Sequence, residues 1–93
     1  MNTKQTSLSE VRLSLCSLTR KIFTKKLKLV VTSNNKPCFT MAAVENEKDG
    51  AEMTSTRFRT HTSEILDLLE LNECVFITDY GKRRVVCRRI END

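Results

Sequence analysis

The 93-residue chain contains no tryptophan, only one histidine and no long apolar run. Because it has no tryptophan and only four phenylalanines, a core must be built largely from leucine, valine and isoleucine. The single histidine, His61, offers little to a metal ion, so we expect no metal site. No stretch approaches the roughly 20 apolar residues of a membrane-spanning helix, and the N-terminal MNTKQTSLSE lacks the apolar centre of a secretory signal. We therefore expect a cytoplasmic protein that has no membrane partner.

The sequence also lacks the residues of a catalytic site. No nucleophile paired with a base, no glycine-rich phosphate loop and no metal-ligand spacing occurs, so we expect neither an enzyme nor a small-molecule substrate or cofactor. His61 is spaced to share a helix face with Glu64 and Asp67, and we expect it to be a surface histidine. A chain of 93 residues is expected to form one domain, or two half-domains that share a core.

Four cysteines are present, none of them in a CxxC pair: Cys16, Cys38, Cys74 and Cys87. Each lies in an apolar run, which favours reduced, buried thiols. A disulfide or a zinc site is the alternative.

Charge is divided unequally along the chain. Residues 1–46 hold eight basic side chains against two acidic ones, a net charge of +6, whereas residues 47–93 hold eight against ten, a net charge of −2. The second half gathers its positive charge in GKRRVVCRRI. Basic patches of this kind suit an acidic partner, most often a nucleic acid.

The first half is expected to form a helix followed by a β-hairpin. Apolar residues recur at helical spacing over 8–26, and either Ser7 or Ser9 can cap the helix start. The apolar face consists of Leu8, Val11, Leu15, Leu18 and Ile22. A strand rich in β-branched residues is predicted over 27–32, then a turn at SNNKP and a returning strand over 38–44.

A charged segment divides the chain. The stretch ENEKDGAE contains Gly50 and shows no apolar period, so we interpret 47–53 as a linker. This places a first half at 1–46 and a second half at 54–93, both within one compact domain.

The second half repeats the order of the first. A helical face follows Ser55 or Thr56 and consists of Phe58, Thr62, Ile65, Leu66 and Leu69. Strands are predicted over 74–78 and 84–90, joined by a turn at DYGK.

The two hairpins align without a gap at an offset of 46 residues, and the helices align at 47. The identical hairpin pairs are Thr32 with Thr78, Lys36 with Lys82, Glu45 with Glu91 and Asn46 with Asn92. Four identities in the 17 positions from Val30 onward exceed the roughly one expected by chance. Because the helix faces, the turns and the strand order also agree, we interpret the chain as a tandem duplication.

Each half resembles the N-terminal domain of the Phd/YefM antitoxins. The shared pattern is a lead segment, a helix of the form S-x-x-x-R-x-x-L-x-x-x-L, a strand that ends in I-T and a turn that reads G-K-P. The first half matches it with SLSEVRLSLCSLTRKIFTKKLKLVVTSNNKPCFTM, and the second with STRFRTHTSEILDLLELNECVFITDYGKRRVV. Arg12 and Arg59 occupy the position of the helix arginine. Asn35 stands where the family usually has glycine, and Arg83 where it usually has proline.

The resemblance implies an α+β fold in which two helix-plus-β-hairpin units pack as an intramolecular pseudo-dimer, or a chain that forms a homodimer. Family members dimerise through this domain and bind operator DNA through basic residues at the helix start and in nearby loops. The resemblance and the basic KKLK and KRR segments together predict eight DNA contacts: Arg12, Lys25, Lys26, Lys36, Arg57, Arg59, Lys82 and Arg83. Solvated surface charges are the alternative for each of these residues.

The predicted strands carry apolar residues on both faces. In the first hairpin Leu29 and Val31 oppose Val30, and the second hairpin repeats the pattern around Phe76. A single helix cannot cover both faces, so we expect the other half or another subunit to cover the second one.

The last strand contains three arginines outside the DNA set: Arg84, Arg88 and Arg89. They either protect an exposed sheet edge or bind an acidic partner. Both interpretations stay open at this point.

Two functions fit these expectations. The first is an antitoxin-like, DNA-binding transcriptional autoregulator whose affinity falls steeply with salt. The second is a protein-binding inhibitor that neutralises a toxin or a host enzyme by occlusion, of the kind that a mobile element or a phage carries. The divergence of the two copies favours inhibition. So does the second helix-plus-hairpin unit, which stands in the place where the family usually has a tail that binds the toxin. The acidic Asp67, Glu70 and Glu73 form either a solvated helix face or a surface for a basic partner.

Overall fold

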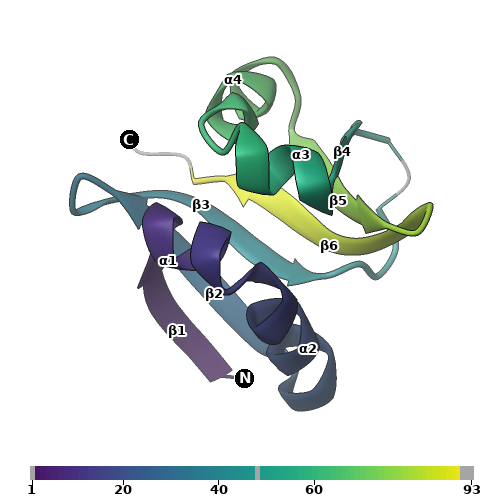
Figure 1. Ribbon diagram of the computed structural model, residues 1–93, viewed down its shortest axis with the longest axis horizontal. Coiled ribbons are helices and arrows are strands. Elements are labelled where there is room, and N and C mark those ends of the chain that lie inside the picture. The colour runs from purple at the N-terminus through teal and green to yellow at the C-terminus, as the bar shows by residue number, and fades with distance from the viewer. Residues whose placement is uncertain (1, 48, 91–93) are drawn as a thin grey trace.

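Residues 2–47 and 49–90 are described by the computed structural model, in which a six-stranded mixed β-sheet carries four α-helices (Figure 1). The elements in chain order are β1 (Asn2–Ser7), α1 (Leu8–Leu13), α2 (Leu15–Lys25), β2 (Leu27–Ser33), β3 (Lys36–Ala43), β4 (Ala51–Thr54), α3 (Ser55–Thr60), α4 (Glu64–Leu71), β5 (Cys74–Asp79) and β6 (Lys82–Arg89). This is the α+β class that the sequence predicts. None of the described helices is long and apolar enough to cross a membrane.

The sheet has the strand order β1-β2-β3-β6-β5-β4. β2 and β3 form one antiparallel hairpin, β5 and β6 form another, and the antiparallel pairing of β3 with β6 joins the two. β1 and β4 are edge strands that run parallel to β2 and β5. The sequence pattern predicts neither edge strand, because NTKQTS is polar and AEMT is only four residues long. β4 also begins inside 47–53, the segment interpreted as a linker.

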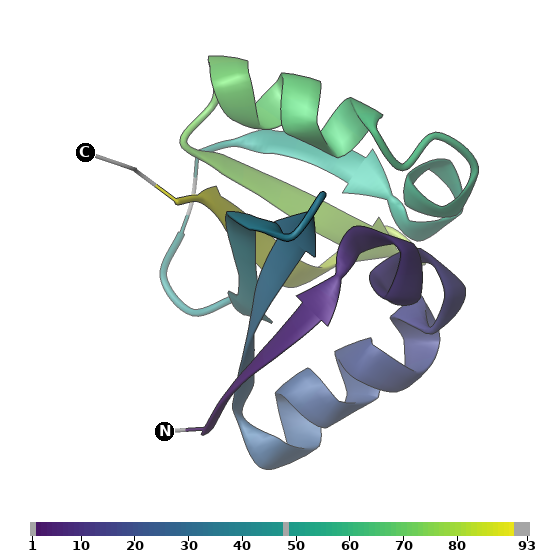
Figure 2. The same cartoon turned by 90° about the vertical axis from the view of Figure 1, so that its left-hand side faces the viewer.

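All four described helices lie on one face of the twisted sheet (Figures 1 and 2). α1 and α2 contact β2, while α3 and α4 contact β5. The main core fills the space between these layers, and its fully buried side chains include Val11, Ile22, Leu29, Val31, Phe39, Met41, Phe58, Ile65, Val75, Val85 and Cys87. The interior is therefore mainly aliphatic, as the absence of tryptophan predicts.

Each predicted helix is in fact two helices. The helix expected over 8–26 breaks at Ser14, where φ is −120° and ψ is 28°, and the second breaks at His61, where φ is −133° and ψ is 58°. Serine, threonine and histidine are weak helix formers, and hydroxyl groups compete for backbone partners. Thr62 shows this competition, because its hydroxyl donates to the Phe58 carbonyl at 2.8 Å. The apolar spacing runs on through both breaks, so periodicity alone does not reveal them.

The local signals at the helix starts are largely confirmed. Ser7 caps α1, and its Oγ accepts a hydrogen bond from the Glu10 backbone N–H at 3.1 Å. α3 is capped by Thr54, one residue before the positions that the sequence suggested, and Thr54 Oγ1 accepts from the Arg57 N–H at 3.0 Å. Both caps satisfy a donor that the first helical turn leaves unpaired.

Both predicted hairpin turns are confirmed. In the first turn Asn34 and Asn35 have φ values of 53° and 65°, and in the second Tyr80 and Gly81 have φ values of 52° and 76°. Two successive residues with positive φ match the twist of the flanking strands. Asparagine and glycine adopt this conformation readily, whereas tyrosine does so rarely.

The offset between the halves also relates positions in the structure. Register shifts occur after Val31 in the first hairpin and after Ile77 in the second, 46 residues later. In the β3–β6 pairing, Met41 lies opposite Cys87, which is again the residue 46 positions later. Each half has the element order β-α-α-β-β.

The face of the sheet that points away from the helices, here called the outer face, has a second small apolar cluster. Its buried members are Cys74, Phe76 and Val86, and Val44 packs against them. Val44 belongs to the strap, the connection from β3 to β4 that comprises the described residues 44–47 and 49–50. Because β6 and β5 separate β3 from β4, this connection has to cross the sheet. The expectation that the other half covers this face is confirmed in part for the second hairpin, because Val44 of the first half packs there and the rest of the strap continues the cover.

Gly50 packs closely against β5, and its replacement tests this packing. A Cβ at Gly50 would lie 2.6 Å from the Cys74 carbonyl oxygen and 2.9 Å from the Phe76 ring. We expect Gly50→Ala to lower the free energy of unfolding by about 1–3 kcal/mol, the usual cost of overpacking. The exposed Asp49→Ala is the matched control and should stay within about 0.5 kcal/mol of wild type in urea titrations. Equal stability of the two variants would contradict a closely packed strap.

Candidate nucleic-acid interface

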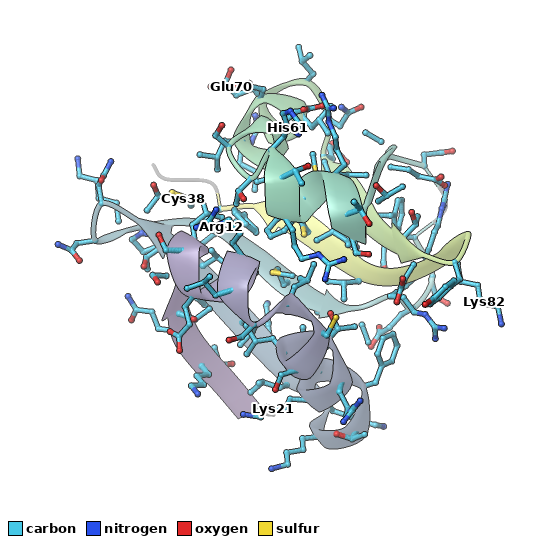
Figure 3. The ribbon with its side chains drawn as sticks, viewed as in Figure 1. Arg12, Lys21, Cys38, His61, Glu70 and Lys82 are labelled. Atoms are coloured by element: carbon cyan, nitrogen blue, oxygen red, sulfur yellow. The ribbon has the colours of Figure 1, made fainter. Side chains whose placement is uncertain are left out.

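Two equivalent arginines lie where α1 meets α3 at the middle of the helical layer. Each is directed toward the opposite half of the chain. Arg59 on α3 brings its Nη1 to 4.0 Å from Sγ of Cys16 on α2. Arg12 on α1 lines a depression of about 620 Å³ together with Glu64 and Asp67 of the second half. The resemblance predicts both as DNA contacts, and the structure places both on the exposed helical layer (Figure 3 labels Arg12).

The two long helices carry opposite charge. α2 holds Arg20, Lys21 and Lys25 and no acidic residue. α4 holds Glu64, Asp67 and Glu70 and no basic residue. Figure 3 shows Lys21 and Glu70 toward opposite ends of the molecule. The charge difference between the halves is therefore a spatial separation across the helical layer, and an anionic partner is attracted to the first half.

Two of the predicted DNA contacts form ion pairs inside the second half. Arg57 lies 2.8 Å from a carboxylate oxygen of Glu64. Arg83 lies 2.6 Å from Glu52, and its guanidinium also sits 4.2 Å from the centre of the Phe76 ring. Their charge is largely neutralised locally. Among the described residues, no ion pair is found for Arg12, Arg20, Lys21, Lys25, Lys26 and Lys36 of the first half.

The remaining predicted contacts lie apart from the arginine pair. Lys36 and Lys82 each follow a hairpin turn, and the two hairpin tips point to opposite sides of the molecule (Figure 1; Figure 3 labels Lys82). Lys25 and Lys26 stand at the C-terminal end of α2, where they line a groove of about 1030 Å³. The eight predicted DNA contacts therefore do not form one continuous surface.

The arginines of β6 do not protect a sheet edge. β6 lies between β3 and β5, so the edge interpretation of Arg84, Arg88 and Arg89 is wrong. Arg88 belongs to the strap contact instead, with its Nη2 3.1 Å from Glu47 and its Nη1 3.2 Å from Sγ of Cys74. Arg84 is half-buried and Arg89 is exposed.

The four cysteines are free thiols, as expected, but only Cys74 and Cys87 are buried. Burial raises the pKa of the Cys87 thiol, because the thiolate would lose its solvation. Cys38 is partly exposed, and Cys16 is exposed because its position on α2 points away from the buried Leu15 and Leu18. The prediction that all four thiols are buried is therefore wrong for these two.

His61 is exposed, as the sequence predicts, and its Nδ1 lies 2.9 Å from the Thr60 hydroxyl. Over 2–47 and 49–90, no three histidine, cysteine or acidic side chains are gathered as metal ligands would be.

Sequence reasoning missed Arg20 and Lys21 as candidate contacts. Both are exposed on α2, and Arg20 lies one helical turn after Cys16, which Arg59 approaches. The signal was present in the sequence, since the helix pattern places both residues off the apolar face. Neither matches the helix arginine of the Phd/YefM pattern, so the resemblance gave them no role.

Comparisons of the chain with protein-family models, with curated proteins and with solved structures find no match.

The strap contact predicts a pH dependence of stability. The Glu45 backbone N–H donates to Glu47 Oε1 at 3.0 Å and lowers the pKa of the Glu47 carboxyl below its ordinary 4.5, with Arg88 adding to the effect. A lowered folded-state pKa stabilises the fold above the ordinary value, and the contribution is lost as the pH falls through the folded value. We expect Glu47→Gln to cost about 1 kcal/mol at pH 7 and the gap from wild type to close well below pH 4.5. Urea titrations from pH 3 to 7 measure it, and a gap that stays constant would contradict the strap contact.

Proposed function

We propose that this protein is an antitoxin-like, DNA-binding transcriptional autoregulator that contacts the phosphate backbone mainly with its first half. The observation that carries the proposal is the set of cations on α1 and α2 that have no ion pair among the described residues, joined by Arg59 from α3. Unpaired arginine and lysine side chains on one exposed surface suit phosphate contacts, which supply most of non-specific DNA affinity.

The internal repeat supports a role for one chain as its own dimer. Both halves have the order β-α-α-β-β, a helix break at the same place and a register shift at the same place. The Met41–Cys87 pair relates β3 to β6 as a two-fold axis would, because each residue is the other's equivalent. In this proposal the halves are diverged copies of one Phd/YefM-like unit, and β3 and β6 form the joint between them.

Charge favours contact on one side of this pseudo-dimer. The acidic residues Glu64 and Asp67 share a depression with Arg12 and weaken its attraction for phosphate. The equivalent Arg59 lies beside α2, which has no acidic residue. A duplex is therefore expected to lie along α2 and to reach Arg59, while α4 repels it.

Replacing Arg20 by glutamate tests this surface. The change reverses a charge on the exposed side of α2, so we expect the Kd for a duplex from the protein's own upstream region to rise about tenfold at low salt. The slope of log Kd against log salt concentration should become shallower by about 1, because one phosphate contact is lost. Fluorescence anisotropy at several salt concentrations measures both quantities.

Lys36→Glu is the matched control, because it makes the same change of charge at a hairpin tip. We expect it to raise the Kd by less than about threefold. Equal losses in the two variants would mean diffuse attraction to the net charge and would contradict the α2 surface. Light scattering of the wild-type complex should show one chain per duplex, and two chains per duplex would contradict the pseudo-dimer.

A second function, a protein-binding inhibitor, is favoured by the acidic helix. α4 exposes Asp67 and Glu70 and ends at Leu71, whose exposed fraction is 83%. An exposed leucine next to carboxylates suits a basic protein surface with an apolar contact. By this mechanism the second half would occlude a toxin or a host enzyme.

The double variant Asp67→Lys and Glu70→Lys tests this alternative. If α4 binds a basic protein, tagged wild-type chain should capture one stoichiometric protein from a lysate of the natural host, and the double variant should lose it because two attractive charges become repulsive. Arg20→Glu should retain the captured protein, which separates this surface from the DNA surface. No stoichiometric capture by the wild type would contradict inhibition by α4.

A further inference from the structure

The outer face of the sheet is covered in the second half and open in the first. Equivalent residues lie 46 positions apart, so Val30 corresponds to Phe76 and Thr40 to Val86. Phe76 is fully buried and Val86 is 3% exposed beneath the strap. Val30 and Thr40 are only partly buried. Within the described residues, the first half has no segment that crosses this face.

A groove of about 1030 Å³ occupies this uncovered region. It runs from the C-terminal end of α2 round the end of the sheet, where Leu27 and Ala43 pack against the main core, and on to the outer face and the strap. On the outer face the floor is formed by Thr40 and Ala42, and Val44 of the strap borders it. A floor made of a sheet surface suits an extended chain, and the volume lies at the upper end for small-molecule sites.

Three lysines form one wall of the groove, Lys25, Lys26 and Lys28. None of them makes an ion pair among the described residues. Lys26 ends α2 in a left-handed backbone conformation, with φ of 50°. The opposite wall holds Glu45 and Glu47, and Glu47 already pairs with Arg88. Arg88 lines the groove on that side but is paired with Glu47, so the cations without an ion pair among the described residues stand along the lysine wall.

The strap shows how this kind of surface is filled. It is an acidic segment that places Val44 on the apolar cluster and Glu47 on Arg88. The groove has the same two elements, an apolar sheet surface and unpaired cations. Nucleic acid fits it less well, because Glu45 and Glu47 would face phosphates. Phe23 is the single aromatic residue among the described lining residues, so the groove has no series of rings on which successive bases could stack.

We propose that the groove binds an extended, acidic peptide segment of a partner protein. One apolar side chain of the peptide rests on Thr40 and Ala42, and carboxylates meet Lys26 and Lys28. The site combines the outer face of the sheet with the C-terminal end of α2, so Lys25 borders both this groove and the surface proposed for DNA. Lys26 and Lys28 belong to the groove alone, and the peptide proposal does not depend on the DNA proposal.

The probe for a direct test is the peptide VENEKDGAE, which has the sequence of residues 44–52. Titrated into the isotope-labelled full chain, it should shift the backbone amide signals of 25–28 and 40–44 in proton–nitrogen NMR spectra. The charge-reversed peptide VKNKEKGAK should cause no such shifts. Absence of shifts at millimolar peptide, shifts confined to β5, or equal binding of the reversed peptide would each overturn the proposal.

Two double variants that change the net charge equally complete the test. Lys26→Glu with Lys28→Glu should weaken peptide binding at least tenfold, whereas Arg20→Glu with Lys21→Glu should leave it within about twofold. For a DNA duplex the order of the two effects should be reversed. The peptide proposal is overturned if the duplex shifts the amide signals of the groove and if the Lys26/Lys28 variant weakens duplex binding more than the Arg20/Lys21 variant does. Nucleic acid would then be the occupant of the groove. Lys26→Gln with Lys28→Gln, checked by circular dichroism, separates loss of charge from loss of fold.

Discussion

The antiparallel pairing of β3 with β6 is the contact on which the rest of the structure depends. It turns two half-sheets into one six-stranded sheet and brings α1 against α3 above it. A separated half would have three strands, two helices and an open edge at β3 or β6. A chain of 93 residues buries only about two-thirds of its unfolded surface, so half of it lacks the apolar burial for a stable fold. The shared core around Met41 and Cys87 is thus a consequence of size.

The same pairing determines where the connecting chain must run. Because β6 stands next to β3, the way from β3 to β4 passes over β6 and β5, and all four described helices occupy the other face. The connection therefore becomes the cover of the second half's outer face, with Gly50 allowing its close approach to Phe76. Nothing equivalent crosses the described part of the first half. The strand order, which sends the β3–β4 connection over β6 and β5, and the small size of Gly50 therefore leave the outer face covered in the second half and uncovered in the first.

Local chemistry made much of the fold predictable, and contacts across the sheet made the rest unpredictable. The Asn34–Asn35 and Tyr80–Gly81 turns and the Ser7 cap follow from preferences of a few adjacent residues. The edge strands and the strap depend on partners distant in sequence, which hydrophobic periodicity does not detect. The helix breaks have local causes, but the apolar spacing continues through them and so does not reveal them. For the candidate site, the charge division between the halves was readable from the sequence. The sequence did not show which arginines form ion pairs, because the partners of Arg83 and Arg88 lie 31 and 41 residues away in the chain.

The two halves differ in side-chain size and charge on two surfaces, the outer face and the helical layer, and on each surface the differences are of one kind. On the outer face, the strap contacts Phe76 and Arg88, whereas the residues at the equivalent positions, Val30 and Ala42, are smaller, and Ala42 lines the groove that the lysines border. On the helical layer, α2 is basic throughout and α4 acidic throughout. Random drift would mix charges and sizes within each surface, because solvent-exposed positions tolerate most substitutions. Under the proposed duplication, two faces that each differ coherently around a common joint are what halves with different partners would show.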